Sequence, residues 1–471
     1  MTSTHQSAPL TEKKYIFPFV VVTSLFFIWA IGVHLNDVLV PHFKKAFDLS
    51  DFQSSFIQVA FFGGYFLAAF PAGRVMEKIG YRNGILVGLL ICSVGTLLFL
   101  PAASSQQYVF FLVALFVMSS GQSFLEVGAN PYVTILGPPE TSARRINLAQ
   151  SFNAVGSTLV PLFGAAFILS GVEYTATQRA AMSSQQLHSY VTSELNLVKV
   201  PYLVITGIFL SVAALIYFAH LPEVHAPEPP RRSTADSAKQ DRLFAHPHLV
   251  KGIFAQFLYV GAQVGVASFL IRFTKQTMPE GLLRMANWGA QFDVSHQGAH
   301  ASFLTHLIPD QPEKMAALFL VIHQIGFMMG RFSGSWMMKR VFAARLLTIF
   351  GIGALVCTFL GVVFSGFFAV LAIVLVGFFN SIMFPTIFAL SLKNLGPYTK
   401  RASSFLVMSI IGGGLIPAAM GRISDLSNIQ KALVVPLLCY LFIIYFAARG
   451  YRPAPVHAFA ESAVPSQIEA G

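Results

Sequence analysis

Long apolar stretches alternate with short polar segments along the whole chain of 471 residues. A helix needs about 20 apolar residues to cross the hydrocarbon core of a membrane. By this criterion the pattern predicts an all-α membrane protein with twelve transmembrane helices. Their rough limits are 16–41, 53–76, 83–102, 107–135, 146–170, 200–220, 248–273, 315–338, 345–364, 367–392, 402–423 and 431–450.

The segment 221–247 separates the first six predicted helices from the last six and is rich in proline and charge. This composition is typical of a flexible linker. We therefore expect an N-terminal half at 1–220, a C-terminal half at 248–452 and a disordered tail at 453–471. About two thirds of the 31 Lys and Arg residues fall on the side that holds both termini, so the termini are predicted to be cytoplasmic.

The two halves resemble each other after their fourth helices. The chain reads LGPPETSARRINLAQSFNAVGSTLVPLFG from Leu136 and LGPYTKRASSFLVMSIIGGGLIPAAMG from Leu395. Both stretches run from L-G-P through basic residues into a helix that contains proline followed by glycine. A duplicated six-helix unit is typical of transporters with a substrate site between the halves, near the middle of the bilayer.

Composition excludes several other classes of protein. The chain is 55% hydrophobic and 11% charged, whereas soluble proteins carry about 25% charged residues. The net charge of +11 lies largely in short loops, so it reflects membrane topology and not nucleic-acid binding. The polar N-terminus has no signal peptide pattern, so the first apolar helix is expected to remain in the protein.

Two carboxylates interrupt the predicted helices, Asp37 in the first and Glu126 in the fourth. Intramembrane acids usually face a water-filled cavity and often relay protons. At a rise of about 1.5 Å per residue, Asp37 lies near the outer rim, where it could instead cap its helix in interfacial water. Glu126 lies deeper, and its alternative role is a buried carboxyl held by a neighbouring helix. We favour proton coupling for both.

Amide side chains gather on the helices expected to line a central cavity. Amides both donate and accept hydrogen bonds, which matches the hydroxyl groups of a sugar. The alternative is that they bond neighbouring helices to one another. The pair Gln150 and Asn153 shares one helix face. The predicted substrate-binding residues are His34, Asn36, Asn130, Gln150, Asn153, Gln256, Gln263 and Asn380.

No cofactor or metal is expected. In the long external loop 276–312, His296 and His300 are four residues apart, which suits a metal only if that stretch is helical, and a solvated loop is the better interpretation. The three cysteines fall inside apolar spans and form neither a disulfide framework nor a metal motif. The chain has no G-x-x-x-x-G-K-[ST] loop for ATP. An enzyme is disfavoured because no nucleophile–base pair accompanies the carboxylates.

Several stretches resemble the L-fucose–proton symporter family of the major facilitator superfamily, which includes glucose/galactose transporters. They are, in order, LNDVLVPHF, FLEVGANPYVTILGP, RINLAQSFNAVG, AQFLYVGAQ, FPTIFALSLKNLG and SFLVMSIIGGG. The loop GRVMEKIGYRN from Gly73 also follows the superfamily's pattern. The resemblance implies the major facilitator fold and alternating access, with Asp37 and Glu126 as the two coupling carboxylates and Gln150 and Asn153 near the sugar.

At three positions this chain carries other residues than the fucose permeases that it resembles elsewhere. Those proteins carry asparagine, tryptophan and tyrosine where His34, Ala267 and Phe384 stand here. All three positions are expected near the cavity, so the departures concern the choice of sugar and leave the transport class intact.

The sequence thus predicts a monomeric, proton-coupled symporter in the inner membrane of a bacterium. Its expected substrate is a monosaccharide, L-fucose or a related hexose such as galactose or glucose. Two alternatives remain within transport: a sugar uniporter without proton coupling, and a proton-driven exporter of small molecules. An exporter would need a broader and more apolar cavity than the amides suggest.

Overall fold

The structure, a computed structural model, describes residues 8–47, 49, 51–168, 182–219, 221–223, 243–295 and 312–453. These residues are helical almost throughout and include no strand, which confirms the all-α prediction. The first helices are η1 Lys13–Tyr15, α1 Ile16–Ala46, α2 Asp51–Leu97, α3 Phe99–Ser105, α4 Tyr108–Ile135, η2 Pro139–Thr141, α5 Ser142–Ile168, α7 Ser184–Leu197 and α8 Lys199–Phe218. The later ones are η3 Leu243–Ala245, α10 Pro247–Thr277, α11 Pro279–Ser295, α13 Pro312–Met337, α14 Ala343–Val363, α15 Phe367–Asn380, α16 Met383–Ser391, η4 Gly396–Tyr398, α17 Thr399–Met408, η5 Ser409–Ile411, α18 Gly412–Leu426, α19 Ile429–Ala432, α20 Val434–Tyr445 and η6 Phe446–Gly450.

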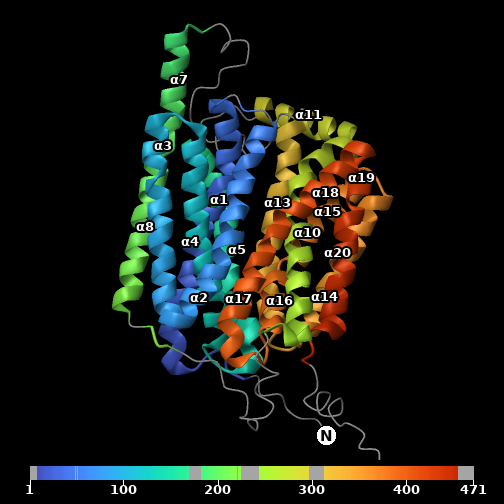
Figure 1. The fold of residues 1–471 in the computed structure, drawn as a ribbon. Helices are drawn as coiled ribbons and strands as arrows, with labels where there is room; N and C mark the ends of the chain where they lie inside the picture. Colours follow the sequence, from blue (N-terminus) through green and yellow to red (C-terminus); the bar gives the residue numbers. More distant parts are fainter. Residues whose placement is uncertain are drawn as a thin grey trace, which may run out of the picture.

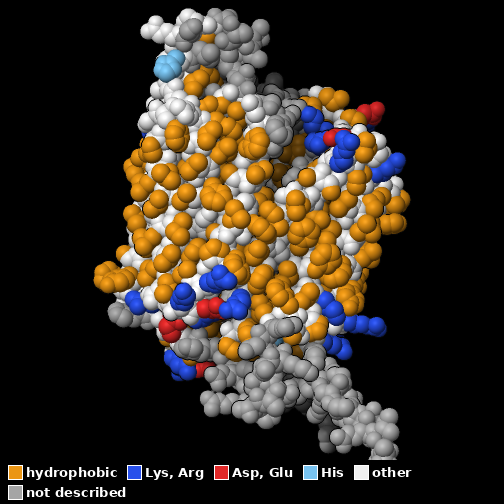
Figure 2. All heavy atoms as spheres, in the orientation of Figure 1, with side chains coloured by type: hydrophobic (Ala, Val, Ile, Leu, Met, Phe, Trp, Pro, Cys, Tyr) orange, Lys and Arg blue, Asp and Glu red, His pale blue; other side chains and the backbone are white. Residues whose placement is uncertain are grey.

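The helices cross a membrane twelve times, as the sequence predicts. Among the described residues, ten stretches are long and apolar enough to span a bilayer. One of them, Phe56–Ser105, has 50 residues and turns at Gly80, so it contains two crossings. The remaining crossing is α5, which packs along α1. Apolar side chains cover the lateral surface of the bundle in Figure 2, as expected of a multi-pass membrane protein in contact with lipid.

The bundle has two ends, the Gly80 end and the far end. The Gly80 end holds the turn at Gly80 and the connections 136–141 and 395–398, and it lies at the bottom of Figure 1. The far end, at the top, holds α3, α7 and α11. Helices α1 to α8 form one side of the bundle and α10 to α20 the other (Figure 1).

The far end differs from the sequence prediction in one respect. The stretch 276–312 was expected to be a solvated loop, but α11 forms within it. Its residues Leu282 and Ala286 are buried where α11 packs against α13, so one amphipathic face stabilises the helix. The histidines at 296, 300 and 306, the linker residues 224–242 and the tail 454–471 lie outside the described residues.

The turn at Gly80 is fastened to the end of α8. Gly80 has a φ of 82°, a left-handed conformation that favours glycine. The next two backbone N–H groups, of Tyr81 and Arg82, donate to the carboxylate of Glu223 at 3.3 and 3.2 Å. A carboxylate is favoured there because the N–H groups at the start of a helix carry partial positive charge. The contact fixes where the second crossing of α2 begins.

Arg145 organises the connection between α4 and α5. Its side chain is fully buried, and its guanidinium donates hydrogen bonds mostly to backbone carbonyls. The acceptors are the carbonyls of Val133 (3.1 Å), Leu10 (3.0 Å), Pro138 (2.9 Å), Thr134 and Gly137, and the hydroxyl of Thr141 (2.6 Å). A planar guanidinium with five donors suits such a cluster.

Replacing Arg145 by methionine is therefore expected to destabilise the protein. Several buried carbonyls lose their donor, and each unsatisfied group costs about 1–3 kcal/mol. We expect the melting temperature in detergent to fall by several degrees, while Arg144→Met, next to it but half-buried, changes it little. Equal melting temperatures for the two variants would contradict this role of Arg145.

Candidate transport site

The two sides of the bundle meet through α5, α2 and α4 on one side and α13, α16 and α17 on the other. Polar contacts mark this seam. Ser403 Oγ donates to the Val127 carbonyl at 2.9 Å, and Asn147 Nδ2 donates to Thr386 Oγ1 at 3.0 Å. These residues lie within a few turns of the Gly80 end, so the halves are joined there.

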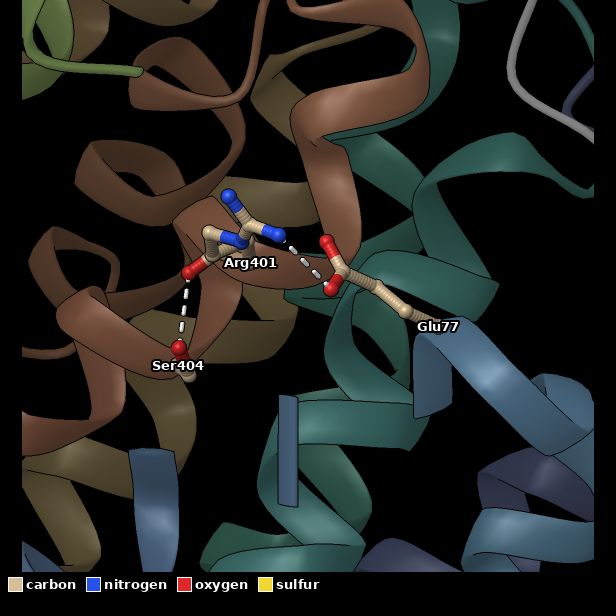
Figure 3. A network of polar contacts seen from close by, with 3 residues as sticks. All are labelled: Glu77, Arg401 and Ser404. Carbon is tan, nitrogen blue, oxygen red and sulfur yellow. Dashed lines mark hydrogen bonds and ion pairs between the residues drawn. The ribbon is translucent and has the colours of Figure 1, made fainter. Parts of the chain in front are cut away.

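An ion pair joins α2 to α17 across the seam near the Gly80 end. Glu77 of α2 accepts from Arg401 of α17 at 3.1 Å (Figure 3). Ser404 donates back to the Arg401 carbonyl at 2.7 Å. The helices approach closely because Gly73 faces Ser404: a Cβ atom on Gly73 would lie 2.8 Å from that side chain.

Neutralising Glu77 or Arg401 is expected to loosen the Gly80 end modestly. Their side chains are 28% and 46% exposed, and exposed ion pairs contribute about 1 kcal/mol or less. A cysteine placed at Ser335, a buried residue whose hydroxyl contacts the Arg144 carbonyl across the seam, reports opening through its alkylation rate.

We expect Glu77→Gln and Arg401→Gln each to raise that rate by about two- to fivefold, because so exposed a pair contributes about 1 kcal/mol or less. The exchanged pair Glu77→Arg with Arg401→Glu should restore a slow rate. Glu280→Gln on α11 is the matched control, since this acid is exposed and lies at the far end. A slow rate in both single variants would contradict the role of the pair.

Glu126 lies within the seam and is 7% exposed. Its Oε2 atom is buried without a hydrogen-bond partner in the described part of the chain. Its charge interacts with that of Arg331 on α13, which is 4% exposed. A buried carboxylate on α4 and a buried guanidinium on α13 thus lie on the two sides of the seam.

Arg331 bridges the halves directly. Its Nη1 donates to the backbone carbonyl and to Oε1 of Gln150 on α5, the latter at 3.0 Å. Its Nε donates to the Ser381 carbonyl at 3.0 Å, in the break between α15 and α16. The guanidinium also lies 4.6 Å from the ring centroid of Phe327. One side chain therefore joins α13 and the broken helix to α5.

The predicted amides of the N-terminal side fall into two groups. Gln150 Nε2 donates to Asn130 Oδ1 at 3.0 Å, and Asn130 Nδ2 has no partner among the described residues. Asn130 follows Glu126 by one helical turn, so these residues form one cluster with Arg331. Asn153 instead donates to the Phe26 carbonyl of α1 at 3.1 Å.

The predicted amides of the C-terminal side lie apart from one another. Gln256 is fully buried on α10, with both amide atoms unpartnered in the described structure. Gln263, two turns further along α10, is half-buried. Asn380 lies close to the Tyr440 hydroxyl of α20. Its backbone carbonyl accepts a hydrogen bond from the Tyr259 hydroxyl at 3.0 Å.

The remaining predicted residues lie on α1. His34 is half-buried, whereas the side chains of Asn36 and Asp37 lie outside the described part of the molecule. Helix α1 continues to Ala46, so Asp37 is not at its C-terminus. Among the described residues, no group of three or more His, Cys, Asp or Glu could hold a metal ion.

The profile of the Major Facilitator Superfamily matches residues 20–420. The chain belongs to this superfamily. The chain is 37% identical over 442 residues to the glucose/galactose transporter of Brucella abortus biovar 1 (strain 9-941), covering 94% of this chain and 96% of that protein. It is 38% identical over 439 residues to the L-fucose-proton symporter of Escherichia coli (strain K12), with 93% of each covered.

Solved structures of the superfamily agree with this assignment. The crystal structure of FucP in the outward conformation matches with a TM-score of 0.76 at 37% identity, covering 92% of this chain and 99% of that one. The human organic anion transporter MFSD10 matches with a TM-score of 0.57 at 14% identity, over 92% of this chain and 99% of that one, which shows the fold alone. The superfamily fold and these relatives are those of transporters and not of enzymes.

Arg331, the buried residue that joins the two halves, was not among the residues predicted from the sequence. Arg331 lies within the predicted span 315–338, in the stretch MMGRFSG. The signal that identified Glu126, one charge inside an apolar helix, applies equally to it. Arg145 carried a weaker signal, because arginines in short connections are common.

Proposed function

We propose that the chain is a proton-coupled symporter that carries a monosaccharide into the cell by alternating access. The observation that carries this proposal is the cluster of Glu126, Arg331, Gln150 and Asn130, which places a buried carboxylate at a hydrogen-bonded bridge between the halves. The names of the relatives, a glucose/galactose transporter and an L-fucose-proton symporter, support the same substrate class.

The proposal includes an orientation in the bacterial inner membrane. We place the Gly80 end and both termini in the cytoplasm, because most Lys and Arg lie at that end. The halves, 1–220 and 248–452, then touch at the cytoplasmic end, which corresponds to an outward-facing state. Figure 2 shows a hollow between them near the far end. A monomer suffices, since the Glu126 cluster lies within one chain.

Charge explains how one proton would be coupled to the movement. With Glu126 ionised, its charge attracts that of Arg331 across the seam. Taking one partner away leaves a buried charge uncompensated, which is costly. A proton on Glu126 removes this charge and frees the halves to separate at the Gly80 end. The amides of Gln150 and Asn130 then exchange their mutual bond for bonds to sugar hydroxyls.

The choice of sugar is part of the proposal. Within reach of the cluster, Tyr259 and Phe384 present rings whose centroids are 6.4 Å apart. Such rings suit the apolar face of a hexose. His34 and Phe384 stand where fucose permeases are expected to have asparagine and tyrosine, so galactose and glucose are candidates beside L-fucose.

Uptake into proteoliposomes tests the proposal. We expect labelled sugar to accumulate when the outside is more acidic, and a protonophore to abolish the accumulation. Unlabelled fucose, galactose, glucose and mannose as competitors identify the substrate. Uptake that ignores the gradient would favour a uniporter, and gradient-driven extrusion would favour an exporter. Protein-free vesicles are the control.

A further inference from the structure

Gln122 is a fully buried amide that the site described above does not use. It lies on α4, and both its Oε1 and its Nε2 atoms lack a hydrogen-bond partner among the described residues. An unpartnered buried polar group costs about 1–3 kcal/mol. Leucine or methionine would fill such a place without that cost, so the amide needs an explanation other than packing.

Gln122 lies at a depth between the two carboxylates predicted for coupling. It precedes Glu126 by one turn of α4, so both side chains are on the same helix face, about 6 Å apart along the axis. Across the helix pair, its Nε2 lies beside Gly32 of α1. Asp37 follows Gly32 on α1 in the direction of the far end.

The space around the amide is too small for a sugar. A Cβ atom on Gly32 would lie 2.5 Å from Gln122 Nε2 and 3.4 Å from the ring of Phe209. Glycine at 32 therefore leaves room for the amide and for little more. A sugar does not fit there, whereas a single water molecule needs only a small space and two to four polar partners.

We propose that Gln122 positions a water molecule against Oε2 of Glu126 and so provides the step by which a proton reaches Glu126 from the far end. This inference rests on the proposed symport. The amide accepts from the water through Oε1 or donates to it through Nε2, and the water donates to the carboxylate. In the step, the water gives one proton to Oε2 and takes one from hydronium or water on the far-end side, so it is regenerated. Gln122 itself is a positioning residue and is not protonated.

The test is Gln122→Leu in proteoliposomes, compared with the unchanged protein. We expect gradient-driven sugar accumulation to slow by about tenfold, the scale expected when a hydrogen bond that holds a reacting water is lost. Sugar exchange without a gradient should stay within about twofold, because the loaded, protonated carrier exchanges sugar without releasing its proton. The melting temperature should stay equal or rise, since a buried unpaired amide is removed.

Two further variants make the outcome decisive. Gly32→Ala displaces the Gln122 amide without altering it. It should also slow accumulation while leaving exchange unchanged, and it provides this test even if Gln122→Leu folds poorly. Thr358→Val is the matched control: it removes a fully buried hydroxyl on α14 that also has no partner among the described residues, and it should leave transport intact.

The outcomes separate this inference from the proposed function. Full gradient-driven accumulation by Gln122→Leu, or an equal loss of accumulation and exchange, overturns the positioning role while symport stands. A wild-type protein that ignores the gradient overturns both.

Discussion

Replacing Glu126 by glutamine is expected to abolish gradient-driven accumulation of sugar while sugar exchange across the membrane continues. Glutamine has nearly the same shape as a protonated glutamate but cannot release or take up a proton. The variant therefore stays in the state that exchanges sugar. We expect accumulation to fall by about 100-fold or more, as when a group that transfers a proton is removed. Parallel uptake and exchange assays measure the split.

The pH dependence adds an independent check on Glu126. Exchange by the unchanged protein should fall at alkaline pH, because the ionised carboxylate holds Arg331 across the seam. Exchange by Glu126→Gln should show no such fall. The control is Glu280→Gln, an exposed acid on α11 whose loss should alter neither assay. Normal accumulation by Glu126→Gln would contradict its role.

Replacing Arg331 by methionine is expected to cause the second large loss. The variant loses the donors to Gln150 and to the Ser381 carbonyl, and it removes the buried positive charge that attracts Glu126. Each buried acceptor that is left without its donor costs about 1–3 kcal/mol. We expect uptake and exchange both to fall, with a lower melting temperature. Arg331→Lys should keep only part of the transport activity and of the stability, because lysine keeps the charge but not the planar set of donors.

A control and a double variant complete this experiment. Arg340→Met removes an exposed arginine beyond the end of the same helix, and its transport should be unchanged. Combining Arg331→Met with Glu126→Gln should lower the melting temperature less than the two single effects added together, because the groups interact. Additive effects would show that the two charges act independently.

Sequence alone predicts the membrane-spanning helices because each needs a long apolar run. It misses α11 and α7, since these short helices mix polar and apolar residues and have no such run. Arg331 has the same local signal as Glu126, but that signal does not say whether the arginine head group extends to water or turns into the bundle. In the structure its head group instead turns inward to Gln150.

The sequence does not predict which of the candidate site residues contact one another. Glu126 and Gln150 were identified as single polar residues in apolar helices, which is a local signal. Their meeting with Arg331 depends on how α4, α5 and α13 are rotated and packed, which no local pattern contains. The same holds for Asn153 and Asn380, which are also amides in apolar helices. Asn153 contacts α1, whereas Asn380 lies beside α20.

The most direct test of proton–sugar symport is to record internal pH when sugar is added to proteoliposomes without any pH gradient. A pH-sensitive dye inside the vesicles reports proton movement, with Glu126→Gln as the control. We expect the transported sugar to acidify the interior, and Glu126→Gln to show exchange without acidification. Entry of labelled sugar into vesicles of the unchanged protein with no change in internal pH would contradict it.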